Sequence, residues 1–227
     1  MSASERFLFT FFNLEIDRTY LPAIAQGFLL TVVIAVCIVI SGITLGLILA
    51  MFRSSGFRIV NFLIAAFVDV FRAIPPLVII LIFFFGLPSV GINMSSFTVT
   101  WVCLSLVLGA FAEEIFWAGI LAVSRGQWEA ARSTGLGQMQ TLLYVVLPQA
   151  IRLTIPPLTN RTIAITKMTA LGSVIGFGEI LSQSTTAVSF SGNPSPLVLG
   201  AFAYLLLFLP VVVVGRWIET RFAWKRQ

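Results

Sequence analysis

The chain has 227 residues, of which 58% are hydrophobic and only 10% are charged, and its formal net charge is +5. With a mean hydropathy of +1.01, it has too few polar side chains to cover a water-exposed surface, which excludes a soluble globular protein, a disordered segment and a nucleic-acid-binding module. Histidine is absent and both cysteines lie in apolar runs, so neither a histidine-based site nor a disulfide framework is expected. A polytopic membrane protein remains.

Five apolar segments are each long enough for a helix that crosses the hydrocarbon core, which takes about 20 residues. The predicted spans are approximately 26–52, 59–85, 98–123, 153–178 and 197–217. Backbone polar groups in lipid must be hydrogen-bonded within their own segment, and the alternating pattern of a membrane barrel is missing, so helices are predicted. Since these spans use most of the chain, the sequence predicts one all-α membrane domain over residues 1–227.

Two proline pairs fall inside these spans, Pro75–Pro76 in the second and Pro156–Pro157 in the fourth. Because proline removes a backbone donor, each pair is predicted to break the helical hydrogen bonds of its span. A broken membrane helix can present carbonyl groups to a cavity, and a simple kink is the alternative.

Two pairs of glycines have the four-residue spacing that permits close helix contact. They are Gly42 with Gly46 and Gly172 with Gly176. The contact can form between two copies of the chain or within one copy, and the spacing alone does not favour either.

The basic residues that flank the spans are distributed unequally. The side of the N-terminus holds two, Arg6 and Arg18. The other side holds nine: Arg53, Arg58, Arg125, Arg132, Arg152, Arg216, Arg221, Lys225 and Arg226. The positive-inside rule therefore predicts an external N-terminus and a cytoplasmic C-terminus.

Seven charged residues lie within or beside the predicted spans. They are Asp69, Arg72, Glu113, Glu114, Arg161, Lys167 and Glu179. Each costs roughly 2.5–3.5 kcal/mol at the bilayer centre, so none is expected to face lipid. Side chains of both signs beside a path suit a zwitterionic substrate, and pairing between helices is the alternative. The four acidic and three basic residues nearly cancel, so charge favours no particular amino acid.

For two pairs of these charged residues, their spacing in the sequence limits the contacts that they can make. Asp69 and Arg72 are three residues apart, so they can pair on one helix face or contact a substrate. Glu113 and Glu114 point about 100° apart on a helix. At most one of them can face a central path, and the other needs a partner on a neighbouring helix.

The stretch 124–152 between the third and fourth spans is amphipathic. Good helix formers over Gln127–Thr134 are followed by Gly135, which predicts a short helix capped by a left-handed glycine. A second helix is predicted from Gln138 to Val146, ended by Pro148. Such a loop could be held in a groove of a soluble partner and transmit the partner's motion to two spans.

This loop resembles the EAA loop of ABC importer permeases. The family pattern is E-A-A, three residues, G, nine residues, I-x-L-P, and the chain has Glu129-Ala130-Ala131, Gly135 and Val145-Val146-Leu147-Pro148. Other segments resemble the histidine/glutamine-type permeases for polar amino acids: 71–77, 112–115, 125–132, 147–150, 157–160 and 173–179. The likeness extends over about 26–222. The chain departs from the family pattern at 116–120 and 167–170.

The resemblance implies the permease subunit of a bacterial type I amino-acid importer, located in the inner membrane. Implied partners are cytoplasmic ABC ATPase subunits, a second permease chain (the same or related), an extracytoplasmic amino-acid-binding protein, the amino acid and membrane lipid. Residues implied to couple to the ATPase are Glu129, Ala130, Ala131, Gly135, Leu147 and Pro148. Candidates for the substrate path are Glu114, Lys167, Arg161, Asp69, Arg72 and Glu179.

The motifs of other function classes are missing from the sequence. There is no G-x-x-x-x-G-K-[ST] loop, so ATP hydrolysis is expected in a separate chain. There is no H-E-x-x-H or G-x-S-x-G, so an intramembrane enzyme is not expected, nor is a cofactor, metal or nucleic-acid partner. The alternative function is a self-contained secondary transporter that couples ions through the intramembrane carboxylates.

Overall fold

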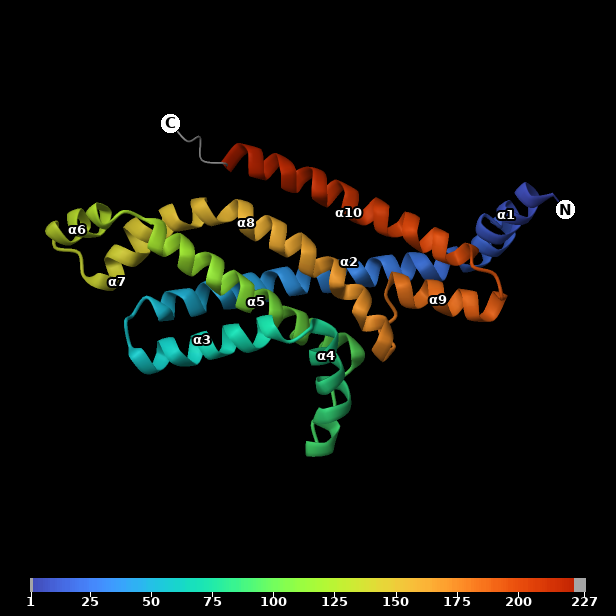
Figure 1. Cartoon of the computed structure of the whole chain (residues 1–227), viewed down its shortest axis with the longest axis horizontal. Coiled ribbons are helices and arrows are strands. Elements are labelled where there is room, and N and C mark those ends of the chain that lie inside the picture. Colours follow the sequence, from blue (N-terminus) through green and yellow to red (C-terminus); the bar gives the residue numbers. More distant parts are fainter. Residues whose placement is uncertain (1, 223–227) are drawn as a thin grey trace. The chain divides into compact units, whose positions relative to one another are not determined.

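The computed structural model describes residues 2–222, and within that range the chain is almost entirely helical and contains no strand (Figure 1). The α-helices are α1 (Ala3–Phe11), α2 (Leu14–Arg53), α3 (Arg58–Ala73), α4 (Pro76–Leu81), α5 (Ser96–Ala122), α6 (Arg125–Ser133), α7 (Gln138–Thr141), α8 (Leu147–Lys167), α9 (Ile180–Ser191) and α10 (Ser195–Phe222). Two π-helical segments, η1 (Ile82–Gly86) and η3 (Leu142–Val146), and two 3₁₀ segments, η2 (Leu87–Val90) and η4 (Met168–Ile175), complete them. The all-α prediction is confirmed.

Four helical segments of the described range are long and apolar enough to cross a membrane: 3–53, 96–122, 138–175 and 195–221. A fifth candidate arises if α3 and the helical segment that follows it to Val90 form one span. This agrees with the predicted architecture, although α2 begins at Leu14 rather than near residue 26. The basic residues Lys225 and Arg226 lie outside the described residues.

The two proline pairs behave differently. Between α3 and α4 the chain leaves the helix at Ile74, which has φ −85° and ψ 130°, because a residue before proline favours extended backbone. The predicted break is confirmed there. At Pro156–Pro157 the helix is not interrupted, because α8 runs through both prolines, which fits the alternative of a simple kink.

The expected end of a helix at Pro148 is also wrong. The segments α7, η3 and α8 follow one another without a gap from Gln138 to Lys167. Pro148 is the second residue of α8, directly after the π-helical turn. A proline cannot donate to the residue four positions earlier, and here that missing bond coincides with a change of helical hydrogen-bond pattern.

The chain divides into two compact units. The first unit contains residues 1–38, 76–104 and 166–212. In it the buried Thr31 hydroxyl accepts a hydrogen bond from the Ile180 amide at 3.3 Å, which joins α2 to α9. The Asn193 side chain donates to the Phe9 carbonyl at 3.0 Å, which fastens α1 to the turn before α10.

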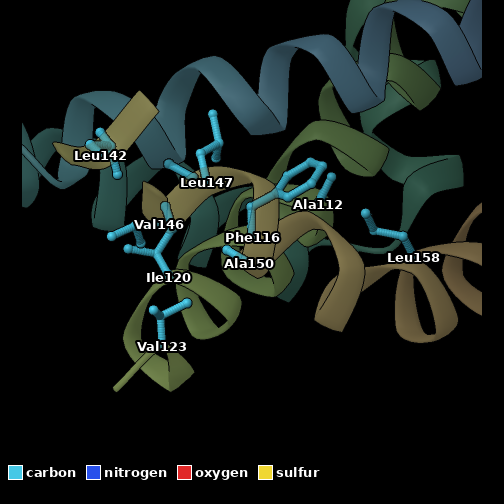
Figure 2. Close-up of a cluster of buried hydrophobic side chains, with 10 residues drawn as sticks. Ala112, Phe116, Ile120, Val123, Leu142, Val146, Leu147, Ala150 and Leu158 are labelled. Carbon is cyan, nitrogen blue, oxygen red and sulfur yellow. The ribbon is translucent and has the colours of Figure 1, made fainter. Parts of the chain in front are cut away.

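The second unit contains residues 39–75, 105–165 and 213–227. Its core is a cluster of buried hydrophobic side chains in which α5 faces η3 and α8 (Figure 2). From α5 come Phe116 and Ile120, and from the facing segments come Val146 and Ala150. This core therefore joins the end of one span candidate to the start of the next.

The glycine pairs contact residues of the same chain. A β-carbon at Gly42 would lie 2.8 Å from Leu108, and one at Gly172 would lie 2.8 Å from the Thr100 hydroxyl. Gly176 has φ +76° and follows η4 as its left-handed cap. Contact within one chain accounts for Gly42 and Gly172, and the left-handed turn accounts for Gly176.

Candidate functional site

The loop of residues 124–152, which contains the EAA pattern, begins with α6 and turns at Gly135. Gly135 has φ +89°, which glycine adopts without steric cost, and no atom lies within 4 Å of the position its β-carbon would take. The predicted left-handed cap is confirmed. The turn needs glycine for its backbone conformation alone, since a side chain would meet only open space.

The EAA tripeptide has one buried and two exposed residues. Glu129 and Ala130 are exposed, whereas Ala131 is buried with 7% of its surface accessible. On the same helix, Trp128 packs against the core cluster of the second unit. One face of α6 thus packs near the end of α5 and the start of α8, and the other face is exposed.

The other residues of the EAA pattern are likewise divided into buried and exposed ones. Leu147 is buried in the core cluster, and Gly135 and Pro148 are exposed. The Gln149 amide donates to the Gln127 side chain at 3.2 Å and to the Val145 carbonyl at 2.7 Å. This pair links α6 to the start of α8, a contact that the sequence reading did not identify.

Glu113 is fully buried and forms an ion pair with Arg53 at the end of α2. One guanidinium nitrogen, Nη1, donates to both carboxylate oxygens at 3.1 Å. The Arg53 guanidinium also lies 5.0 Å from the ring centroid of Trp117. The expectation that one of the two adjacent glutamates has a partner on a neighbouring helix is confirmed, whereas Arg53 had been counted only as a flanking charge.

Glu114 belongs to a second group of charges, the Phe111 cluster, which consists of Arg72, Phe111, Glu114 and Arg161. Arg72 Nη1 lies 2.7 Å from Glu114 Oε1. The guanidinium of Arg161 is 3.8 Å from the Phe111 ring centroid, and that of Arg72 is 5.3 Å from it. Guanidinium groups beside an aromatic face gain from the ring quadrupole, so one ring helps to hold two like charges near each other.

The predicted pairing of Asp69 with Arg72 is wrong. Among the ion pairs of residues 2–222, Arg72 is joined to Glu114 of α5, and Asp69 is exposed on α3. A carboxylate on a facing helix competes successfully with one on the same helix because long side chains meet it directly across the interface.

The other two path candidates lie in the first unit. Lys167, at the end of α8, is exposed and lines a cavity of about 650 Å³ together with Tyr204 and Phe208 of α10. The Tyr204 hydroxyl donates to Glu179. Glu179 is fully buried, and its carboxylate also accepts from the Leu181 amide at 3.0 Å and the Ser182 amide at 2.7 Å, so it caps α9.

The structure thus brings Arg72, Glu114 and Arg161 together around one ring, and places Tyr204 in contact with Glu179. Phe111 and Tyr204 were missed from sequence because single aromatic residues do not stand out in a chain that is 13% aromatic. Within residues 2–222, no group of three or more histidine, cysteine or acidic side chains is arranged to hold a metal ion.

Known proteins match nearly the whole chain. The family described as binding-protein-dependent transport system inner membrane component matches residues 42–224. The probable glutamine ABC transporter permease protein GlnM of Bacillus subtilis is 34% identical over 86% of this chain and 91% of its own length. The arginine transport system permease protein ArtQ of the same organism is 32% identical over 92% of this chain and 97% of its own length.

A solved structure agrees with these relatives. The crystal structure of an amino acid ABC transporter with histidines superposes with a TM-score of 0.81 at 31% identity, and covers 89% of this chain and 95% of that chain. The sequence match, the helical architecture and the loop geometry all lead to one assignment. The chain belongs to the family of binding-protein-dependent transport system inner membrane components, and it is a multi-pass ABC permease of the bacterial inner membrane.

Proposed function

We propose that the chain forms the translocation path of an ATP-driven importer of polar amino acids. We also propose that residues 124–152, the coupling loop, connect the chain mechanically to the ATPase. The observation that carries this proposal is the division of α6 into two faces. Glu129 and Ala130 are exposed for a partner, and Ala131 and Trp128 attach the helix to the core of the second unit.

This arrangement suits a mechanical role. A force applied to the exposed face of α6 acts directly on the buried cluster that contains Phe116 and Ile120 of α5 and Val146 of η3. Close-packed side chains transmit displacement because there is little free volume to absorb it. Movement of the loop would therefore become movement of α5 and α8.

In this proposal, the energy for transport comes from ATP hydrolysis in other chains. Two cytoplasmic ABC ATPase subunits hold the coupling loops, a second permease chain completes the path, and an extracytoplasmic binding protein delivers the amino acid. The support is the family itself, whose description contains binding-protein-dependent transport, and relatives whose names contain ABC transporter permease. The permease is then a non-catalytic subunit, and its N-terminus lies outside.

The proposed substrate class rests on the chemical groups that are common to the amino acids named for the two relatives. Glutamine and arginine, named for the two relatives, differ in side-chain charge but share an α-carboxylate and an α-ammonium group. In the Phe111 cluster, Arg72 and Arg161 offer guanidinium groups to a carboxylate, and Glu114, whose side chain is 47% exposed, offers a carboxylate to an ammonium group. We assign this cluster, with Asp69, Lys167 and Glu179 as further candidates, to the path.

Charge reversal at the loop tests the proposal. In membrane vesicles that contain the complete importer, Glu129→Arg should reduce ATP-dependent uptake of labelled glutamine, arginine or histidine at least tenfold, because its side chain is exposed on the partner face. Loss of a charge-assisted contact of about 1.5–3 kcal/mol corresponds to such a ratio. Glu15→Arg reverses an equally exposed carboxylate at the start of α2 and should leave uptake unchanged.

Membrane insertion of both variants is measured in parallel, so that a loss of protein is not mistaken for a loss of transport. If Glu129→Arg retains full uptake, the loop does not carry the drive. If uptake follows an imposed ion gradient in vesicles without ATP, the chain works as a secondary transporter and the proposal falls.

A further inference from the structure

A small pocket in the second unit lies where the end of α5 meets the start of α6. It has a volume of about 320 Å³, and its lining includes Trp117, Leu121, Arg125, Trp128 and Ser54. The pocket shares Trp128 with the attachment of α6 to the core, but it contains no residue of the Phe111 cluster and neither Glu129 nor Ala130.

Three residues that line the pocket, Trp117, Arg125 and Trp128, carry side-chain hydrogen-bond donors. Within residues 2–222, Arg125 forms no ion pair, and neither Trp117 nor Trp128 donates its indole N–H to another residue. The Ser54 hydroxyl donates to the Met51 carbonyl at 2.6 Å, so its oxygen remains able to accept. A ligand that satisfies a guanidinium and two indole groups must be rich in acceptor oxygens, and it should be anionic.

The position of the pocket indicates which class of anionic ligand it binds. The apolar span candidate formed by α5 ends at Ala122, directly beside the lining residues, so the pocket lies at the level of the lipid headgroups. Tryptophan is enriched at this level because its ring is apolar and its N–H is polar. Leu121, a lining residue with 65% of its surface exposed, would contact the glycerol and first acyl carbons of a lipid.

We infer that this pocket is a binding site for the headgroup of an anionic phospholipid. Arg125 pairs with the phosphate, the two indole N–H groups donate to phosphate or glycerol oxygens, and Leu121 contacts the adjoining acyl chain. The lipid thereby bridges the end of α5 and the start of α6. The inference needs only a membrane-embedded chain, so it holds or fails independently of the transported substrate.

The test measures lipid retained by the complete importer. The complex is placed in nanodiscs of phosphatidylcholine that contain phosphatidylglycerol as a minor component, is extracted into detergent, and is analysed by native mass spectrometry. Arg125→Gln should reduce the retained phosphatidylglycerol about fivefold, the ratio expected for one basic residue near the membrane surface. Leu121→Trp, which fills the pocket at an exposed position without changing the charge, should reduce it as well.

Arg132→Gln is the matched control, since it removes an exposed arginine from the same helix but does not line the pocket. It should retain phosphatidylglycerol as the unchanged protein does, and phosphatidylcholine should be retained equally by all variants. An equal loss for Arg125→Gln and Arg132→Gln would reduce the effect to general surface charge and overturn the inference.

Two further results would also overturn it. Displacement of phosphatidylglycerol by millimolar inorganic phosphate would show that the pocket recognises a free phosphate group. Loss of the ATPase from the Arg125→Gln complex, with lipid retention unchanged, would make the pocket a protein contact.

Discussion

Glu113 and Glu114 are adjacent and chemically identical, yet α5 directs them to different partners. Glu113 is fully buried against Arg53, whose side chain is 23% exposed. Glu114 is 47% exposed and pairs with Arg72. A buried carboxylate depends on its partner for solvation, whereas a half-exposed one retains other means of being solvated, so the two pairs should respond differently to the loss of their arginines.

Removal of Arg53 should destabilise the protein strongly. Arg53→Met leaves the Glu113 carboxylate buried without its cation, which typically costs about 3–5 kcal/mol. Thermal unfolding of the purified permease complex in detergent measures the effect. The double variant Arg53→Met with Glu113→Leu should recover most of the lost stability, because no uncompensated charge remains.

Arg72→Met is the comparison for this prediction. Its partner is half-exposed, so the loss should stay below about 1 kcal/mol. Equal destabilisation by Arg53→Met and Arg72→Met would mean that burial of the glutamate does not control the cost. Failure of the double variant to recover would mean that Arg53 acts through its packing on Trp117 rather than through the ion pair.

The helical period predicts that these two glutamates diverge, but it does not tell which arginine each one meets. That choice depends on how α2 and α3 lie against α5, and contacts between helices far apart in sequence leave no periodic signal. Arg53 directly follows an apolar run, so the sequence alone predicts that its charge lies at the membrane–water interface. The ion pair with Asp69 was predicted for the same reason: only neighbours on one helix are visible in a sequence.

At the scale of elements, the contact between α2 and α5 is made by glycines. A β-carbon on Gly46 would lie 2.7 Å from the Glu113 amide nitrogen and 2.8 Å from the Gly109 carbonyl oxygen. These are backbone atoms, which cannot move aside as a flexible side chain can. In lipid, where burial of apolar surface gives little advantage, such close backbone approach is a main source of helix association.

Gly46→Ala should therefore separate α2 from α5. The expected loss is about 1–3 kcal/mol, as for other overpacking substitutions, and it should be visible as a lower unfolding temperature in detergent. Gly86→Ala is the matched control. A β-carbon there would meet only Ile82 at 3.9 Å, so that substitution should be neutral or stabilising by up to about 1 kcal/mol. Gly46→Ala with unchanged stability would contradict the close contact.

A helix boundary can be predicted from the sequence where a single residue type determines the local backbone conformation. The break at Ile74 and the cap at Gly135 each come from a single residue type in a single backbone conformation. The continuation through Pro148 was not predicted, because proline usually ends a helix and the π-helical turn before it has no recognisable sequence pattern.

For the whole molecule, apolar length and the EAA spacing were enough to predict the architecture and the family. Both can be recognised in a single sequence: a span needs a minimum apolar length, and a helix cap places its glycine directly after the helix. The division of the charged candidates between the two units was not visible from sequence. It is clearest in α8, where Arg161 belongs to the second unit and Lys167 to the first.

The orientation of the chain in the membrane remains a prediction, and it can be tested with single cysteines. Nine basic flanking residues against two predict that α1 is outside and that α6 is in the cytoplasm. In a background that carries Cys37→Ala and Cys103→Ala, Ser4→Cys should react with a membrane-impermeant maleimide on intact spheroplasts. Ser133→Cys should react only after permeabilisation. Both serines are exposed, on α1 and α6 respectively, so access to the reagent decides the labelling.

The opposite labelling pattern would place the coupling loop outside the cell, where no ATPase could hold it, and would remove the basis of the proposed drive. Labelling of both positions without permeabilisation would indicate leaky spheroplasts, which a cytoplasmic marker protein detects. The expected pattern would place α6, and the pocket beside it, at the cytoplasmic leaflet. There the Arg125 guanidinium would meet the anionic headgroups of that leaflet.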